Sequence, residues 1–230
     1  MIPTKLHGWV GVLGALALAG CSSAPPSPDW ALEAQSASDR AVKAYLQGQR
    51  RVAALEWRKA FDAVSATGQP SAMAQMALLQ CAAQTAALEF SECATYQTYA
   101  AGALPVQHAY ARYLQVQYGA GDVALLPPGQ QPVAAQLLGR TVMLALPQAE
   151  PLSQLTAAGV ALRAGGIAPE AVDQAVKVAA QQGWRRAAIA WVLVAQRLAQ
   201  AAGDRSKVEA MELRLQVLQS TEAALDPVKK

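Results

Sequence analysis

The chain has 230 residues, of which 53% are hydrophobic and 15% are charged, and its formal net charge is +3 at pH 7. This composition argues against an intrinsically disordered chain. The 52 alanines and 23 glutamines favour helices, because strands prefer β-branched and aromatic residues. A collagen, a disulfide-dense mini-protein and an all-β sandwich are therefore disfavoured.

Residues 1–20 have the pattern of an export signal. Lys5 gives the positively charged n-region of such a signal, and an uncharged apolar stretch from Trp9 to Ala19 gives its hydrophobic region. The segment Leu18-Ala19-Gly20-Cys21 resembles the lipobox of bacterial lipoproteins. The resemblance implies cleavage before Cys21, a diacylglyceryl thioether on its sulfur and an N-acyl chain on the new amino terminus, with no other cofactor. The alternative is an ordinary secreted protein with a chance cysteine after its signal.

The same resemblance implies where the protein resides. Each buried methylene contributes about 0.8 kcal/mol, so two or three acyl chains hold a protein on a membrane stably. Ser22 follows Cys21 where an Asp would favour the inner membrane, which implies an outer-membrane anchor facing the periplasm. Residues 21–29 are rich in Pro and Ser and are predicted to form a tether. Without residues 1–20 the chain keeps 18 basic and 16 acidic residues, a balance that does not indicate nucleic-acid binding.

Proline and glycine punctuation divides the rest of the chain into helical lengths, because Pro favours the first turn of a helix and Gly its end. Helices are predicted over residues 30–47, 50–66, 71–87, 90–103, 105–118, 132–146, 151–164, 169–182, 184–202 and 205–221. The irregular stretch 119–131 is predicted as a linker loop between two helical lobes, 30–118 and 132–221, with a tail over 222–230. The fold class expected is all-α, with about ten helices in stacked antiparallel hairpins.

Part of this pattern is similar to tetratricopeptide repeats. Gly48, Ala53, Trp57 and Ala60 follow the spacing of the second helix of such a repeat, and the run from Trp191 to Leu198 resembles a first helix. In these repeats small residues let neighbouring helices approach while large ones fill the gap between hairpins. A 34-residue period is not sustained along the chain, so the resemblance implies a tetratricopeptide-like α-solenoid, and the alternative is a generic alanine-rich helical bundle.

Two cysteines remain besides Cys21, and in an oxidising compartment an even number suggests pairing. Cys81 and Cys93 lie on either side of Ala87, where a helix–helix turn is predicted, so they would face each other across an α-hairpin. Two separate buried thiols are the alternative. With no companion His or second Cys pair, a zinc site is not expected.

The tyrosines are concentrated in one region. Tyr96 and Tyr99 share one helical face, and Tyr110 and Tyr113 share another, each pair at a spacing of three residues. Tyrosine is enriched at protein interfaces. The four are therefore candidate partner-binding residues lining a groove, and the alternative is that they pack the junction between two hairpins.

Catalytic and metal-binding signatures are absent from the sequence. His108 is the only histidine beyond the export signal, and no Gly-x-Ser-x-Gly elbow accompanies it. None of the glutamates is followed by Ser as in lytic transglycosylases. We therefore expect a lipid-anchored, non-enzymatic adaptor that binds another cell-envelope protein. The alternatives are an envelope enzyme or small-ligand binder with a pocket near His108 and the tyrosines, and a purely structural lipoprotein.

Overall fold

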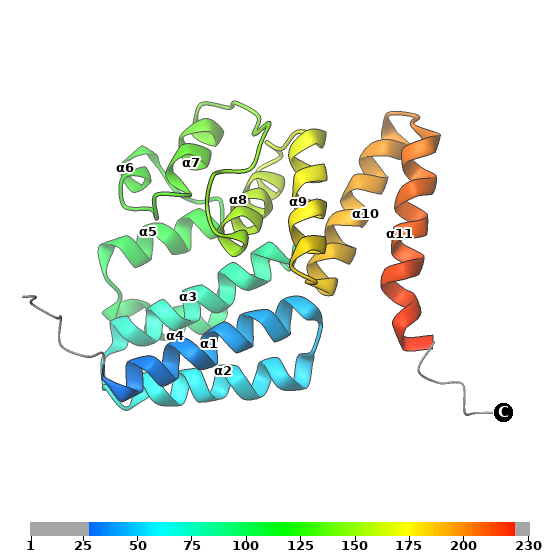
Figure 1. The fold of residues 1–230 in the computed structure, drawn as a ribbon. Coiled ribbons are helices and arrows are strands. Elements are labelled where there is room, and N and C mark those ends of the chain that lie inside the picture. Colours follow the sequence, from blue (N-terminus) through cyan, green and yellow to red (C-terminus); the bar gives the residue numbers. More distant parts are fainter. Residues whose placement is uncertain (1–27, 224–230) are drawn as a thin grey trace, which may run out of the picture.

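The computed structural model describes residues 28–223, and this part of the chain is helical without any extended strand (Figure 1). The expected all-α class is thus confirmed. The elements are α1 (Asp29–Gln47), α2 (Arg50–Ser65), α3 (Pro70–Ala86), α4 (Ala94–Tyr99), the 3-10 helix η1 (Ala100–Gly102), α5 (Pro105–Leu114), α6 (Ala120–Val123), α7 (Gln131–Leu138), α8 (Pro151–Arg163), α9 (Pro169–Gln181), α10 (Arg185–Ala201) and α11 (Arg205–Ala223).

The predicted lipobox ending at Cys21 lies outside the described residues, as do most of the tether and the tail. Within residues 28–223 no helix has both the length and the hydropathy needed to cross a membrane.

Helices begin and end at or next to the predicted residues at the positions at which Pro marks a start or Gly an end. Pro70, Pro105, Pro151 and Pro169 each stand in the first turn of their helix, where the missing N–H would have no helical partner. Gly183 ends α9 with a φ of 64°, and the next amide, that of Trp184, donates to the carbonyl of Ala179 over 2.9 Å. Only glycine adopts this left-handed conformation without steric cost.

Three predicted helices are wrong in extent, because residues other than glycine adopt left-handed conformations. The helix expected over 90–103 begins only at Ala94, since Cys93 has a φ of 50°. The helix expected over 105–118 ends at Leu114, before Val116 with a φ of 60°. A left-handed conformation is rare for a β-branched residue such as Val116, so the sequence does not predict that the helix ends here.

The helix expected over 132–146 ends at Leu138, since Arg140 has a φ of 56°. The chain then runs in extended form past Met143, whose amide donates to the Gly166 carbonyl over 2.8 Å. The amide of Ala168 donates back to the Met143 carbonyl over 3.0 Å. This short parallel bridge replaces the second half of the expected helix.

Sequence neighbours pack as antiparallel hairpins at both ends of the molecule, α1 with α2 and α10 with α9 and α11. In the middle, however, α3 packs against α8, and α1 packs against α10 (Figure 1). In an open solenoid each repeat contacts only its neighbours. The regular tetratricopeptide-like stack is therefore not confirmed, and α3 is a central helix that packs against α1, α2, α4, α5 and α8.

Alanine is the commonest residue of the core, and tryptophan is among its largest side chains. Trp57 of α2 and Trp191 of α10 are buried among alanines such as Ala60 and Ala195, which are residues of the tetratricopeptide-like pattern. The indole N–H of Trp191 donates to the Ala86 carbonyl over 3.0 Å and so joins α10 to the end of α3.

A polar contact reinforces the long-range packing of α1 on α10. The Tyr45 hydroxyl donates to Glu89 Oε2 over 2.6 Å. The Arg186 guanidinium lies 3.3 Å from the other oxygen of Glu89 and 4.4 Å above the centre of the Tyr45 ring. Burial, followed by the Glu89 carboxylate, raises the pKa of Tyr45, so the phenol stays protonated and remains a donor at neutral pH.

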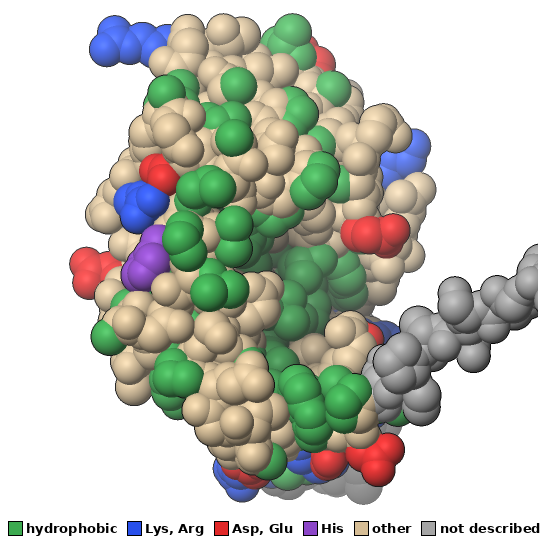
Figure 2. Space-filling view, turned by 90° about the vertical axis from the view of Figure 1, so that its left-hand side faces the viewer, with side chains coloured by type: hydrophobic (Ala, Val, Ile, Leu, Met, Phe, Trp, Pro, Cys, Tyr) green, Lys and Arg blue, Asp and Glu red, His purple; other side chains and the backbone are tan. Residues whose placement is uncertain are grey.

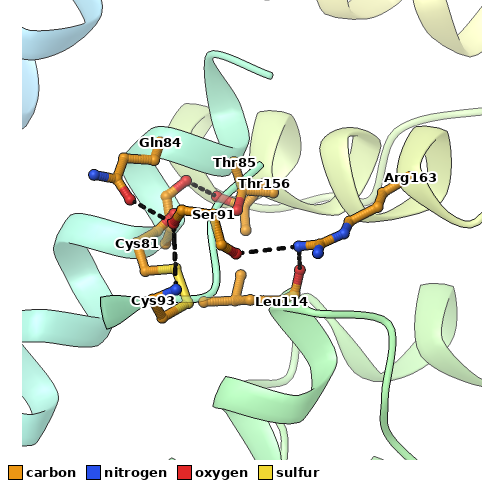
Figure 3. The surroundings of a disulfide bond; sticks show 9 residues. Cys81, Gln84, Thr85, Ser91, Cys93, Leu114, Thr156 and Arg163 are labelled. Atoms are coloured by element: carbon orange, nitrogen blue, oxygen red, sulfur yellow. Dashed lines mark hydrogen bonds between the residues drawn. A yellow bond between two sulfur atoms is a disulfide. The ribbon is translucent and has the colours of Figure 1, made fainter. Parts of the chain in front are cut away.

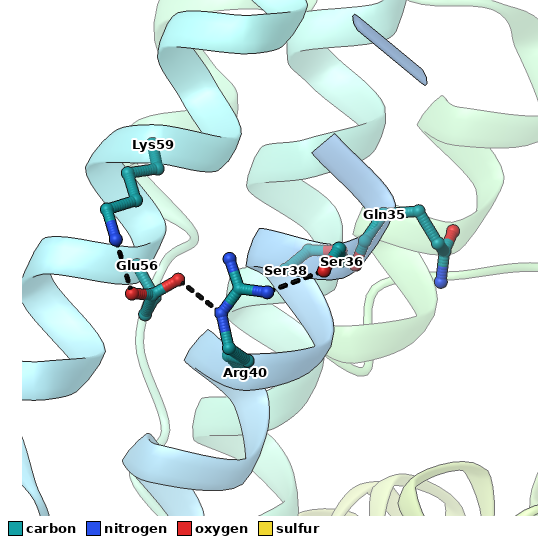
Figure 4. Close-up of polar contacts among 6 residues, drawn as sticks. All are labelled: Gln35, Ser36, Ser38, Arg40, Glu56 and Lys59. Carbon is teal, nitrogen blue, oxygen red and sulfur yellow. Dashed lines mark hydrogen bonds and ion pairs between the residues drawn. The ribbon is translucent and has the colours of Figure 1, made fainter. Parts of the chain in front are cut away.

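A second polar group fixes α1 against α2. The buried carboxylate of Glu56 accepts hydrogen bonds from Arg40 over 2.7 Å and from Lys59 over 2.8 Å (Figure 4). Arg40 also donates to the hydroxyl of Ser36 over 2.5 Å. Lys59 and Arg40 lower the pKa of Glu56, because they favour its ionised form.

The segment predicted as a linker, residues 119–131, is packed into the fold. It forms α6 and buries Leu126 and Gln130. Gln130 accepts a hydrogen bond from the Tyr113 hydroxyl over 2.8 Å and donates to Ser153 Oγ over 2.6 Å. One core cluster contains residues of both predicted lobes, among them Trp57 and Trp191.

The contact between α3 and α8 requires a glycine. A Cβ at Gly159 of α8 would collide with the backbone carbonyl of Thr85 on α3. We expect Gly159→Ala to lower the free energy of unfolding by about 1–3 kcal/mol, because the two helices must separate. Gly121→Ala is the matched control, since nothing lies within 4 Å of its Cβ position. Chemical denaturation measures both, and equal stabilities of the two variants would contradict the close contact.

Candidate functional site

A trough on one face of the molecule is the strongest candidate for a functional site. Two cavities, of about 360 and 310 Å³, share the lining residues Gln75 and Leu79 of α3 and so lie side by side, and together they are called the trough. The first is lined by Gln75, Leu79, Ala82, Val106, Gln107, Tyr110, Leu125, Leu126, Pro127, Leu152, Ser153 and Thr156, and the second by Trp30, Ala31, Ala34, Gln35, Ser38, Val64, Ala72, Gln75, Met76 and Leu79. Figure 2 shows a hollowed face with hydrophobic side chains on its floor and rim.

The trough has a hydrophobic rim that reaches solvent. Val106 is 45% exposed, and Leu125 and Trp30 are each 38% exposed. These side chains come from α5, the turn after α6, and the start of α1. Large apolar groups gathered at a concave surface are characteristic of binding sites.

Amide side chains cross the floor of the trough. Gln107 Nε2 donates to the Ser71 carbonyl over 2.9 Å and to Gln75 Oε1 over 3.3 Å. Gln107 Oε1 in turn accepts from the Leu104 amide over 2.9 Å. Gln107 is therefore fully engaged, whereas the exposed Gln75 has its amide N–H groups free of protein partners within residues 28–223.

Tyr110 is the tyrosine that lines the trough. Its hydroxyl makes no hydrogen bond to the described part of the chain, yet no side-chain oxygen or nitrogen there is both fully buried and unpaired. The half-buried Tyr110 hydroxyl therefore reaches the accessible surface of the trough. Burial of the ring raises the pKa of Tyr110, so the hydroxyl is protonated at neutral pH and can both donate and accept.

The other three candidate tyrosines do not line the trough, which corrects the expectation for them. Tyr96 is 2% exposed and Tyr113 is fully buried, and burial raises the pKa of both. Tyr99 is half-buried beside the same cluster. The rings of Tyr110 and Tyr113 stack with their centroids 6.2 Å apart, as residues three apart on one helical face can, but Tyr113 is the deeper of the two and lies in the core. The hairpin-packing alternative describes Tyr96, Tyr99 and Tyr113.

His108 lies beside this cluster and lines neither cavity of the trough. Its Nδ1 shares a 2.8 Å hydrogen bond with the hydroxyl of Tyr96, and the two rings meet edge to face. Residues 28–223 contain no group of three His, Cys, Asp or Glu side chains that could hold a metal ion. The lining of the trough thus contains neither a histidine nor such a group.

An ion pair positions one wall of the trough. The Asp122 carboxylate of α6 pairs with the Arg112 guanidinium of α5, with 3.0 Å between Arg112 Nε and Asp122 Oδ2. The Gly119 amide also donates to Asp122 over 3.0 Å. Arg112, followed by this amide, lowers the pKa of Asp122. The pair fixes α6 against α5, and with it Leu125 and Leu126, which follow directly.

A disulfide joins Cys81 and Cys93, with their Cα atoms 5.4 Å apart (Figure 3). The expectation that both cysteines stand on helices is wrong for Cys93, which precedes the first residue of α4. Ser91 supports this loop, since its hydroxyl donates to Gln84 Oε1 over 2.9 Å. Arg163 of α8 donates to the carbonyls of Ser91 and Leu114 over 3.3 and 3.2 Å. The loop is thereby bound to α3, α5 and α8.

Most residues that line the trough were not predicted from the sequence. Leu79 and Gln75 lie four residues apart on α3, and Val106 and Tyr110 lie four apart on α5. This spacing is a signal of a shared helical face. The spacing was not informative because apolar residues occur on more than one side of α3. The residues of α3 that line the trough meet residues of α8 only through tertiary packing.

A separate apolar groove lies between α9, α10 and α11. It has a volume of about 310 Å³ and is lined by residues such as Val176, Val192, Leu213 and Val217. Leu213 and Val217 are more than 60% exposed. Its lining lacks the amide and phenol groups of the trough and includes one charged residue, Arg214.

No family model, curated protein or solved structure matches this chain.

The disulfide should contribute measurably to stability. It closes a loop between residues separated by 12 positions, so replacing both cysteines by alanine should lower the free energy of unfolding by about 2–4 kcal/mol. Urea denaturation measures the loss. Reductant should destabilise the parent chain and leave the double variant unchanged. If reduction of the denatured parent released no additional thiols, the bond would be absent from the protein.

Proposed function

We propose that the protein is a lipid-anchored adaptor of the bacterial envelope, held at the outer membrane on its periplasmic side and without catalytic activity. The lipobox-like segment ending at Cys21 supports the anchor. The trough along α3 supports the binding role, and it is the observation that carries the proposal. Its partner is another cell-envelope protein, of which a segment lies in the trough.

The architecture suits the adaptor role because the walls of the trough are held rigidly. The Arg112–Asp122 pair holds α6, and Gln107 ties α5 to the start of α3. The disulfide ties α3 to the start of α4. A preorganised surface loses less conformational entropy when it binds than a mobile one. Anchoring both proteins at one membrane raises their effective concentration, so modest intrinsic affinity is sufficient.

A second candidate function is binding of a small ligand in the same trough. The first cavity, of about 360 Å³, falls in the size range of small-molecule sites, which are mostly apolar with a few polar groups. Tyr110 provides such a group. The enzymatic version would act through His108, which lies beside the trough without lining it, so substrate turnover abolished by His108→Ala in a folded protein would support that version. The adaptor proposal predicts that His108→Ala leaves partner capture unchanged.

The anchor is tested by replacing its acylated atom. Cys21→Ser removes the thiol to which the diacylglyceryl group would be attached, and we expect the incorporation of labelled palmitate to be lost completely. Ser22→Ala is the matched control and should be labelled like the parent. Metabolic labelling of cells followed by immunoprecipitation measures this. An unlabelled parent chain, or a labelled Cys21→Ser chain, would refute acylation at this cysteine.

The partner site is tested by crosslinking intact cells that produce the protein at native level and identifying the captured proteins by mass spectrometry. We expect Val106→Glu and Leu125→Glu to reduce recovery of the envelope partner at least tenfold, because each places a charge on the rim of an uncharged trough. Both residues are partly exposed, so the fold should tolerate them.

Leu144→Glu provides the control for that experiment. Leu144 is 67% exposed and lines neither cavity of the trough, so this variant should capture the partner like the parent. Circular dichroism confirms that each variant is folded. Undiminished capture by the two trough variants, or recovery of the bait alone from the parent, would refute the proposed adaptor role of this surface.

A further inference from the structure

The chemistry of the trough also indicates what kind of partner segment it takes, an inference that rests on the proposed adaptor function. We propose that the trough binds an extended, uncharged, apolar stretch of polypeptide, whose main-chain amides pair with the Tyr110 hydroxyl and the Gln75 carboxamide. Charge, hydrogen-bonding capacity and position each contribute a separate argument.

The first argument is electrostatic. No Asp, Glu, Lys, Arg or His is among the residues that line the two cavities. An ionised side chain placed in the trough would lose hydration without gaining a counter-ion there, which is costly. The lining residues Trp30, Ala34 and Ser38 are followed or preceded in the chain by the charged Asp29, Glu33 and Asp39. None of these three lines either cavity, and Asp39 accepts hydrogen bonds from Gln35. The trough therefore selects against charged segments.

The second argument concerns two of the hydrogen-bonding groups left free in the lining, in which the indole N–H of Trp30 is another without a partner in residues 28–223. The Tyr110 hydroxyl and the Gln75 amide N–H groups face the cavity without protein partners in the described chain, while Gln107, Ser153 and Thr156 are engaged. A lipid acyl chain in the trough would bury both free groups without replacing their bonds to water, at a cost for each. A polypeptide brings carbonyl acceptors for both and an N–H donor for the phenol oxygen.

The third argument concerns conformation. In a helical segment the main-chain N–H and C=O groups are already paired internally, so they offer nothing to Tyr110 and Gln75. An extended segment leaves these groups available and turns alternate side chains to opposite sides. Gln75 belongs to both cavities, so it stands where a segment passes from one to the other. Apolar side chains of the segment would then enter the cavity on either side.

The test uses a random library of 12-residue peptides displayed on phage and the full mature chain held in lipid nanodiscs. We expect enriched peptides to share an uncharged run of apolar residues, and enrichment to be lost on the Val106→Glu chain. Enriched runs containing a shared charged residue would overturn the inference, and so would the absence of enrichment over the Val106→Glu chain.

The hydrogen-bond argument is tested with one enriched peptide in a fluorescence anisotropy titration. Tyr110→Phe removes one hydroxyl and should weaken binding by about threefold to tenfold. Tyr99→Phe is the matched control, since Tyr99 lines neither cavity, and it should leave the affinity unchanged. N-methylation of the main-chain amides of the bound run should weaken binding to the parent chain. Equal affinities for the Tyr110→Phe, Tyr99→Phe and parent chains would overturn the pairing.

The alternative that a lipid acyl chain occupies the trough is tested separately, by titrating a spin-labelled stearate into the same preparation. Stearate that binds in the trough while no peptide does would assign the site to lipid and overturn the inference. The adaptor function fails separately, when the trough variants still capture the envelope partner in cells. If those variants lose the partner but the crosslinked partner segment is charged or helical, the adaptor role stands and the inferred segment chemistry is wrong.

Discussion

The close packing of α3 against α8 is the constraint on which the rest of the structure depends. Gly159 allows the backbone of α8 to approach that of Thr85, and the Thr156 hydroxyl lies 3.3 Å from the Ala82 carbonyl. With α8 in this place, α3 becomes the central helix, which also contacts α1, α2, α4 and α5. The trough exists because helices distant in sequence meet along this one helix.

Small residues explain why a trough remains where helices pack so closely. Its lining includes Ala31, Ala34, Ala72 and Ala82, whose side chains do not fill the space between helix axes. In the core, the gaps between packed helices are filled by larger side chains such as Trp57 and Trp191. Alanine thus serves two purposes in this chain: it brings helices into contact in the core, and it leaves apolar volume open at the surface.

The sequence predicted the all-helical class and the long helices well, because Pro and Gly mark their ends through local steric effects. The predicted helix boundaries were wrong where Cys93, Val116 and Arg140 adopt left-handed conformations. These residue types have no local preference that would predict such a conformation. Tertiary contacts such as that of Tyr45 with Glu89 are not encoded in any periodic pattern. The tyrosine cluster was found by spacing, but only packing around α5 distinguishes Tyr110 from its buried neighbours.

The proposed anchor and the uncharged trough support each other in one respect. Nine residues from Cys21 to Asp29 span at most about 30 Å even when fully extended, so an anchored trough stays close to the membrane surface. A trough that binds through apolar contact and two neutral hydrogen bonds is little affected by salt or by charged headgroups, because screening acts on charges. Under the proposed function, its selectivity would therefore depend on the apolar side chains and main-chain groups that a neighbouring envelope protein presents at that distance.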